Sequence, residues 1–265
     1  MTPSRLLPAI VIATLAFLPS CATNPETGRR SLNVIPDATL NSMGVQAYQE
    51  VLSTEKVSTN ARQTAVVKRV AERIAAASGE KFNWEVNLIE SDQANAFVLP
   101  GGKIVVYTGI LPICENEAGL AFVLGHEVGH AVARHGGERM TQTLGAQLTL
   151  AIADASGLGG PENHGTVMAA MGAGAQYGVL LPFSRAHESD ADHMGIRYMS
   201  RAGYDPHVAP LLWQRMSAGG GQQPPEWMST HPSHETRSTT LEGLIPEAMK
   251  FYDAAPTRYG LGEKL

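Results

Sequence analysis

The chain has little cysteine and few aromatic residues, and it has no excess of basic charge. Only two of its 265 residues are cysteines, so a framework of disulfides is excluded. The formal net charge is −5 and the 20 lysines and arginines are scattered, which argues against a nucleic-acid partner. Hydrophobic residues make up 43% of the chain, enough for a sizeable core. A globular catalytic domain fits this composition better than a nucleic-acid-binding one.

The apolar run at the start of the chain, residues 6–18, is too short to span a bilayer comfortably. It follows Arg5 and leads to Cys21, with a leucine at the third position before the cysteine, so residues 1–20 resemble a bacterial lipoprotein signal peptide. Acylation of Cys21 would then anchor the chain. Because Ala22 is not acidic, we expect the periplasmic face of the outer membrane. An ordinary secretory signal, giving a soluble periplasmic protein, or an uncleaved short anchor is the alternative.

Hydrophobic periodicity predicts a mainly helical α+β fold with a small β-sheet or hairpin. Residues 21–37 are rich in Asn, Pro, Gly and Arg and are expected to form a tether or a surface wrap. Alternating residues predict a strand at 82–89 and a hairpin at 96–108. Helices are expected at 39–53, 59–77, 115–135, 184–201, 207–217 and 233–248. One domain, 38–250, would hold these elements, followed by an undistinguished tail at 251–265.

The segment 136–182 is unusually rich in Gly, Ala and Met and is broken at 157–161. We expect a mobile helical insertion or lid. Packing of its small residues into the core is the alternative. Contact of Met168 and Met171 with lipid is less favoured, because polar residues interrupt both apolar halves.

The sequence His-Glu-Val-Gly-His at 126–130 has the spacing of a metal site. On an α-helix His126 and His130 project from one face, and both can bind a zinc ion about 2.0–2.1 Å away. Glu127 is offset by about 100° and faces a bound water rather than the metal. The apolar residues at 118–125 indicate a buried helix and argue against two exposed surface histidines. The motif predicts one zinc ion per chain on an active-site helix, with the small β-sheet beside it.

A catalytic zinc needs a third protein ligand and one open position. Glu188 is the candidate, since it lies in a polar cluster within the helix expected at 184–201. Asp192, one turn further along, is expected to accept the far N–H of a ligand histidine. A solvated helix face is the alternative for both. Three further histidines lie off these faces and are expected at surface or capping positions: His135, His187 and His193.

The order of these motifs resembles the gluzincin metallopeptidases that include the CAAX prenyl proteases and the HtpX heat-shock protease. The similarity covers residues 40–246 and also rests on 185–192, on 230–233 followed by Arg237, on 95–102 and on 108–109. The export signal and the lack of multiple spans are most similar to the periplasmic lipoprotein branch of BepA-type and Oma-type quality-control proteases. No helical-repeat domain like that of the BepA type is recognised, and prenylated substrates are not expected.

The zinc motif and the resemblance together imply roles for further residues. Glu127 is expected to take a proton from the attacking water and return it to the leaving amine. The resemblance implies that His231 stabilises the oxyanion, or alternatively that it is a fourth zinc ligand that keeps the enzyme latent. A cap on the final helix is a third role for His231. Arg237 is expected to brace this loop by pairing with a carboxylate near the site.

The predicted hairpin offers a place for the substrate. An extended peptide can add as a strand along Asn95, Ala96 and Phe97, and backbone pairing would accept unfolded chains with little regard to sequence. The alternative is a purely structural hairpin, with Phe97 in the core.

Two functions fit these features. The first is a zinc endopeptidase of the bacterial envelope that degrades misfolded or misassembled periplasmic and outer-membrane proteins. The alternative is a latent, chaperone-like lipoprotein that binds client strands and has little peptidase activity. The expected partners are such client proteins and, through Cys21, a membrane; nucleic acid is not expected. The sequence does not indicate an oligomeric state.

Overall fold

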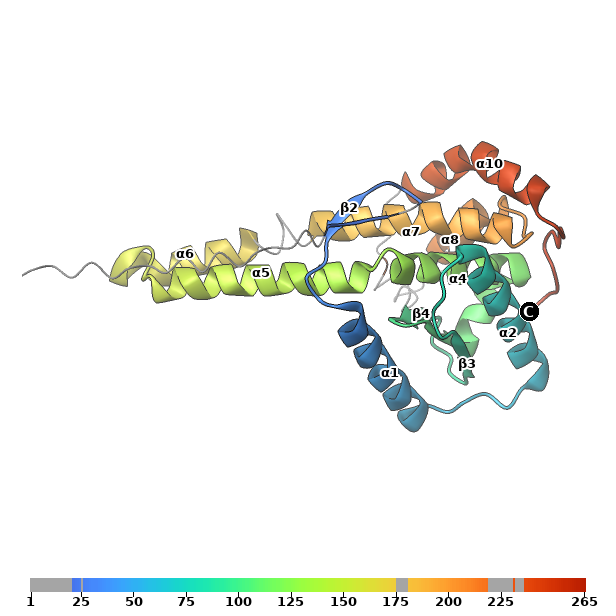
Figure 1. Ribbon diagram of the computed structural model, residues 1–265, viewed down its shortest axis with the longest axis horizontal. Coiled ribbons are helices and arrows are strands. Elements are labelled where there is room, and N and C mark those ends of the chain that lie inside the picture. The colour runs from blue at the N-terminus through green and yellow to red at the C-terminus, as the bar shows by residue number, and fades with distance from the viewer. Residues whose placement is uncertain (1–20, 25, 175–180, 219–230, 232–235) are drawn as a thin grey trace, which may run out of the picture.

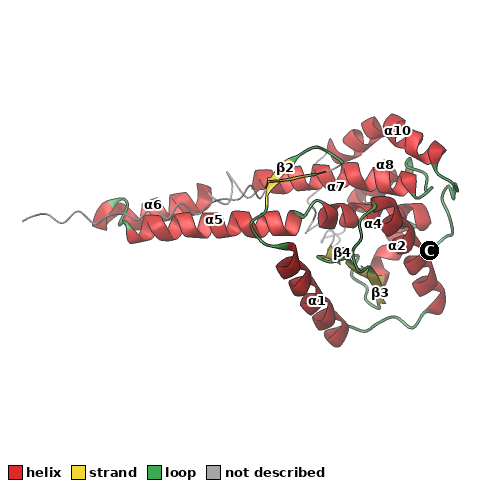
Figure 2. Cartoon of the chain, in the orientation of Figure 1, coloured by secondary structure: helices red, strands yellow, loops and turns green. Residues whose placement is uncertain are grey.

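A computed structural model describes residues 21–24, 26–174, 181–218, 231 and 236–265, and its architecture is mainly helical with two small sheets (Figures 1 and 2). The helices are α1 (Asp37–Thr54), α2 (Ala61–Ser78), the 3-10 helix η1 (Thr108–Ile110), α3 (Leu111–Cys114), α4 (Glu117–Val132), α5 (His135–Ala155), α6 (Gly160–Gly174), α7 (Leu181–Arg201), α8 (Val208–Ala218) and α10 (Thr236–Ala254). The strands are β1 (Cys21–Thr23), β2 (Arg30–Leu32), β3 (Glu85–Ile89), β4 (Ala96–Leu99) and β5 (Lys103–Tyr107). The α+β class is confirmed; the expected signal peptide, 1–20, lies outside the described residues.

Helix α4 forms the centre of the core. Every residue from Glu117 to Gly129 is buried, and α4 packs against α2, α7 and the three-stranded sheet (Figure 1). A helix without a solvent-facing side must be apolar around its whole circumference, as residues 118–125 are. The polar residues that interrupt this surface, His126 and Glu127, are therefore buried by the fold.

The first turn of α4 is capped by the residue that precedes it and by a distant part of the chain. Asn116 accepts a hydrogen bond from the backbone N–H of Gly119 at 3.0 Å. The backbone N–H of Glu117 donates to the carbonyl of Glu263 at 2.9 Å, which satisfies a donor that a helix leaves unpaired. Residues 251–265, expected to be an undistinguished tail, thus complete α10 and then cap the central helix.

Helices α4 and α7 cross at very short range because glycines lie at the contact. A Cβ atom on Gly195 of α7 would lie 2.9 Å from the backbone nitrogen of His126, and one on Gly125 would lie 2.8 Å from the carbonyl oxygen of Gly195. Both distances are shorter than van der Waals contact allows. The absent side chains therefore let the two backbones approach, and this approach brings the polar residues of α7 next to those of α4.

The three-stranded sheet has the order β3-β5-β4, with β3 parallel and β4 antiparallel to β5. The expected hairpin is thereby confirmed, with Phe97 opposite Val105. Strand β4 is an edge strand that packs against α4. Helix α1 covers the sheet through a small apolar cluster with Tyr48 and Ile89, and the ring of Phe97 packs against Tyr107.

The segment expected to be an insertion forms a helical hairpin of α5 and α6 that extends away from the helical body (Figure 1). Along α5, Leu144, Leu148 and Ile152 are half or more exposed. Met168 and Met171 lie on α6, and residues 175–180 of the segment lie outside the described part of the chain. Among the described residues no helix is both long and apolar enough to cross a membrane.

The segment expected to form a tether or a surface wrap lies against the helical body, as the second alternative has it. β1 and β2 form an antiparallel ribbon with Cys21 opposite Leu32. Between these strands Glu26 pairs with Arg197 and Arg201 of α7, and Arg29 pairs with the buried carboxylates of Glu138 and Asp190. Composition alone did not reveal this docking, because the ion-pair partners are more than 100 residues away.

The glycine contact makes a direct prediction about stability. We expect Gly195→Ala to lower the free energy of unfolding by about 1–3 kcal/mol, because the new methyl group overlaps backbone atoms of α4. Urea unfolding followed by circular dichroism measures this change. Gly145→Ala is the matched control: it lies in α5 with no atom within 4 Å of the added Cβ, and it should gain up to about 1 kcal/mol. Equal urea midpoints for Gly195→Ala and the wild type would contradict the role given to this contact.

Candidate metal centre

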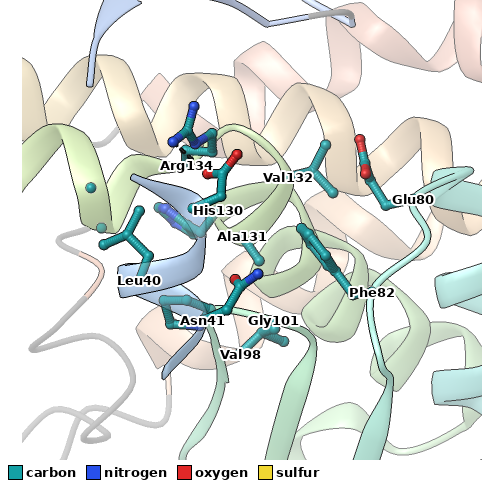
Figure 3. Close-up of a pocket in the computed structure, with 14 residues that line it drawn as sticks. Leu40, Asn41, Glu80, Phe82, Val98, Gly101, His130, Ala131, Val132 and Arg134 are labelled. Atoms are coloured by element: carbon teal, nitrogen blue, oxygen red, sulfur yellow. Dashed lines mark ion pairs between the residues drawn. The ribbon is translucent and has the colours of Figure 1, made fainter. Parts of the chain in front are cut away.

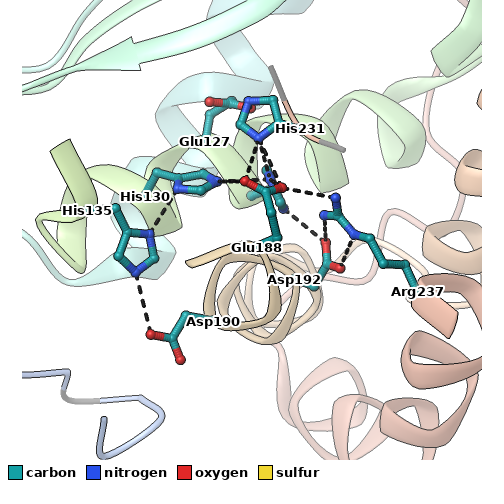
Figure 4. A network of polar contacts seen from close by, with 9 residues as sticks. Glu127, His130, His135, Glu188, Asp190, Asp192, His231 and Arg237 are labelled. Carbon is teal, nitrogen blue, oxygen red and sulfur yellow. Dashed lines mark hydrogen bonds and ion pairs between the residues drawn. The ribbon is translucent and has the colours of Figure 1, made fainter. Parts of the chain in front are cut away.

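Four side chains from distant parts of the chain converge beside the end of α4 (Figure 4). His126 and His130 come from α4, Glu188 comes from α7, and His231 approaches from the C-terminal third of the chain. One nitrogen or oxygen atom from each lies within 4.8 Å of the other three. Among the described residues this is the group whose donor atoms could hold a metal ion.

The spacing of these atoms matches the spacing of ligands around one ion. Four ligands placed tetrahedrally about 2.1 Å from a metal ion lie roughly 3.4 Å from one another. The Nε2 atom of His126 lies 3.1 Å from Nε2 of His130, 3.3 Å from Nδ1 of His231 and 3.4 Å from Oε2 of Glu188. Nε2 of His130 and Oε1 of Glu188 are 3.4 Å apart. The four groups are therefore separated as ligands of a shared ion would be.

The hydrogen bonds of the two α4 histidines show why a cation fits between them. Nδ1 of His126 faces Oδ1 of Asp192 at 3.0 Å, and only a protonated nitrogen can donate to that carboxylate. A neutral His126 then directs the lone pair of its Nε2 atom toward Nε2 of His130, 3.1 Å away. Two lone pairs in a buried site repel each other unless a cation lies between them. The donor set therefore fits a metal ion.

A proton competes with a metal ion for this site. Burial disfavours the charged form of His126, but the carboxylates of Asp192 and Glu188 outweigh burial and raise its pKa to about 9. Burial also opposes ionisation of Glu188, yet its contacts with His126, His130 and His231 hold the pKa of its carboxyl group well below the usual range. Glu188 thus remains an anion, the form that binds metal.

Arg237 of α10 braces the carboxylates of α7. Its guanidinium donates to Oδ2 of Asp192 at 2.7 Å, to Oδ1 of Asp192 at 2.6 Å and to Oε2 of Glu188 at 2.9 Å. It also stacks on the ring of Trp213 at 3.8 Å. These contacts fix both carboxylates (Figure 4). The sequence predicted that Arg237 pairs with a carboxylate near the site, and the structure places it against two.

Glu127 lies next to the donor cluster but outside it. Its side chain is 3% exposed, and its Oε1 atom lies 3.2 Å from Nε2 of His231. His231 therefore faces Glu188 with one ring nitrogen and Glu127 with the other (Figure 4). This position of the Glu127 carboxylate suits proton transfer to or from a group held at the donor cluster.

His135 and His187 are buried, which contradicts the surface or capping roles expected for them. The expected helix 115–135 ends at Val132; Arg134 adopts the left-handed conformation with φ of 57°, and α5 starts at His135. This turn brings Nδ1 of His135 to 2.9 Å from Nδ1 of His130, and the ring of His187 stacks on that of His135. Helical spacing could not find this contact, because it depends on the break.

A cavity of about 240 Å³ opens beside His130 (Figure 3). Its lining includes His130 and Ala131 from the end of α4, Val98 from β4, Leu40 from α1 and Phe82. The cavity therefore lies between His130, the one member of the donor cluster in its lining, and the edge strand of the sheet. Of the residues predicted to bind substrate, Asn95 directly precedes β4, while Ala96 and Phe97 lie on it; none of them is among the cavity lining.

A buried helix that presents two histidines and an intervening glutamate to a carboxylate from a second helix defines a metallopeptidase site. The comparison with known families agrees with this class, because the model of peptidase family M48 matches residues 58–245. The chain belongs to peptidase family M48.

The curated relatives include mitochondrial and bacterial proteases. The chain is 40% identical to the mitochondrial metalloendopeptidase OMA1 of Schizosaccharomyces pombe, over 84% of this chain and 66% of that protein. It is 29% identical to the mitochondrial metalloendopeptidase OMA1 of Homo sapiens, over 86% of this chain and 46% of the relative. It is 27% identical to the beta-barrel assembly-enhancing protease of Escherichia coli, over 88% of this chain and 50% of the relative. The chain thus spans between about half and two thirds of the length of these relatives.

Proposed function

We propose that this chain is a zinc-dependent endopeptidase that holds one zinc ion with His126, His130 and Glu188. The convergence of two imidazoles and a carboxylate beside a buried glutamate carries this proposal, since this donor set is the one that catalytic zinc prefers. When bound, zinc would polarise the scissile carbonyl and lower the pKa of water to about 7.

The residues of the chain supply proton transfer and orientation. Glu127 accepts the proton of the attacking water and delivers it to the leaving amine. Asp192 holds His126 in the tautomer with a free Nε2, and Arg237 keeps Glu188 and Asp192 in place. Because these groups are buried and mutually paired, they are oriented before substrate arrives.

His231 is the group that regulates this site in our proposal. Its Nδ1 atom lies 3.1 Å from both carboxylate oxygens of Glu188 and 3.3 Å from Nε2 of His126, which are ligand-to-ligand distances. With zinc bound, the imidazole would take the fourth ligand position, where the attacking water would otherwise enter. This arrangement supports the latent role over the helix-capping role, and activation requires His231 to move away.

Removal of this imidazole should activate the enzyme. We expect His231→Ala to cleave casein at least about tenfold faster than the wild type. If the closed state holds roughly nine of ten wild-type molecules, opening all of them raises the active fraction about tenfold. Glu127→Gln in the His231→Ala background is the control and should abolish cleavage while zinc content, measured by atomic absorption, stays at one per chain.

The other outcomes discriminate between the remaining roles. Loss of cleavage in His231→Ala with zinc retained would make His231 an oxyanion donor rather than an inhibitor. If neither protein cleaves casein while both bind it, the chaperone-like function would replace the peptidase.

We propose that the substrate binds as an additional strand along β4. The backbone N–H of Tyr107 donates to the carbonyl of Asn95 at 3.0 Å, which fixes the register of β4 on β5. Backbone groups alternate in direction along an antiparallel strand, so those of Ala96 and Val98 point away from β5. Val98 and His130 line the same cavity, so a side chain of the added strand can enter it beside the zinc ligands.

A proline at position 98 tests this strand pairing. Val98→Pro removes an N–H that points away from β5, so the sheet should persist. The substrate loses one backbone hydrogen bond worth roughly 1 kcal/mol, and KM for an unstructured peptide should therefore rise about fivefold. Val98→Ala removes apolar surface but keeps the N–H, and it is the matched control. Equal KM values for the two variants, measured in the active His231→Ala background, would count against strand addition.

We propose further that the substrates are misfolded or misassembled envelope proteins and that Cys21 is lipid-anchored at the outer membrane. The apolar run before Cys21 supports export, and the name of the Escherichia coli relative, beta-barrel assembly-enhancing protease, supports a task in outer-membrane protein assembly.

The anchor makes its own prediction. Radiolabelled palmitate fed to a bacterial host should enter the wild-type chain and fail to enter Cys21→Ser, with the buried Cys114 as the internal control for nonspecific labelling. Equal labelling of both proteins would contradict acylation at Cys21.

A further inference from the structure

The two histidines of α4 differ in how their outer ring nitrogens are held. Nδ1 of His126 faces the carboxylate of Asp192 directly, at 3.0 Å. Nδ1 of His130 faces another imidazole instead, with Nδ1 of His135 at 2.9 Å (Figure 4). Outer contacts of this kind set the tautomer and orientation of a metal-binding histidine. The partner of His130 therefore has to be a hydrogen-bond acceptor.

The contacts of His135 determine which of its nitrogens carries the proton. A His130 that binds a cation through Nε2 keeps its proton on Nδ1 and donates it to His135. His135 must then accept at Nδ1 and carry its own proton on Nε2, which faces Oδ2 of Asp190 at 3.4 Å. Two imidazoles and one carboxylate thus form a directed chain of hydrogen bonds.

Asp190 in turn depends on a residue near the start of the described chain. It is 7% exposed, and its Oδ2 atom accepts from Nε of Arg29. The same guanidinium donates to Oε1 of Glu138 at 3.0 Å and to Oε2 at 2.7 Å. Glu138 is 2% exposed, so Arg29 compensates two buried anions that would otherwise be costly to bury.

We propose that Arg29, Asp190 and His135 are positioning residues for the metal ligand His130, so that docking of the segment between β1 and β2 completes the metal site. The chain of contacts runs from Arg29 to Asp190, then to His135 and finally to His130. It parallels the route from Arg237 through Asp192 to His126 on the other side of the site. The inference rests on the metal-binding role of His130 proposed above.

Metal affinity tests the first step of this chain. We expect His135→Ala to weaken zinc binding about 10–100-fold, the usual cost of removing the partner of a ligand histidine. His135→Asn keeps an acceptor near the position of Nδ1 and should recover most of that loss. Affinity is measured by competition with a chromophoric chelator, on protein whose fold is checked by circular dichroism, and the cobalt absorption spectrum reports the ligand geometry.

The contribution of the N-terminal segment is tested with two arginine variants. Arg29→Gln should weaken zinc binding about tenfold, within the range for an outer contact of a ligand. Arg201→Gln is the matched control, because it removes an ion pair of the same segment, with Glu26, but lies outside the chain of contacts. Its zinc affinity should equal that of the wild type.

Nuclear magnetic resonance of the histidine ring nitrogens shows which nitrogen carries the proton, and a purely structural role of His135 would not determine this. In the zinc-loaded wild type, His135 should carry its proton on Nε2 and His130 on Nδ1. A His135 protonated on Nδ1, or wild-type zinc affinity in both His135→Ala and Arg29→Gln, would overturn the inference while leaving the proposed function intact. A wild-type protein that binds no zinc would instead overturn the proposed function itself.

Discussion

The close crossing of α4 and α7 is the contact on which the rest of the structure depends. Gly125 and Gly195 leave the two backbones in contact, so the polar residues of both helices face each other across a short distance. Longer side chains at these positions would separate the helices and with them His126 and Glu188. The apolar core around α4 holds the crossing in place, and metal ligation can then use side chains that are already oriented.

Helices α4 and α7, which carry most of the site, are held by ion pairs or caps that begin far away in the sequence. Arg29 and Arg237 lie near opposite ends of the described chain, and each neutralises two buried carboxylates. Because buried charges are costly unless paired, neither arginine can be lost without exposing or protonating its partners. Metal binding is therefore expected to be coupled to docking of both ends of the chain rather than to α4 alone.

In the proposed enzyme, the position of His231 would correspond to a closed state. His231 lies at ligand distances from Glu188 and His126, while β4 is an edge strand of the sheet that the described residues form, and the adjacent cavity offers space for a side chain. Strand addition recognises backbone rather than sequence, so a protease with this geometry would act on any extended chain. An imidazole of His231 in the fourth ligand position would limit such broad activity, because it would keep the attacking water out.

The sequence by itself determined the fold class, the helix that carries His126 and His130, and the candidates Glu188 and Asp192, because these features follow from local periodicity. It also pointed to the β4 hairpin, whose turn residues are local. Only the tertiary structure decided that His135 contacts His130, and which atoms of the cluster are contacted by His231, a residue that the family resemblance had already placed near the zinc. The first depends on one left-handed residue that breaks a helix, and the second on packing between distant segments, neither of which leaves a periodic signal in the sequence.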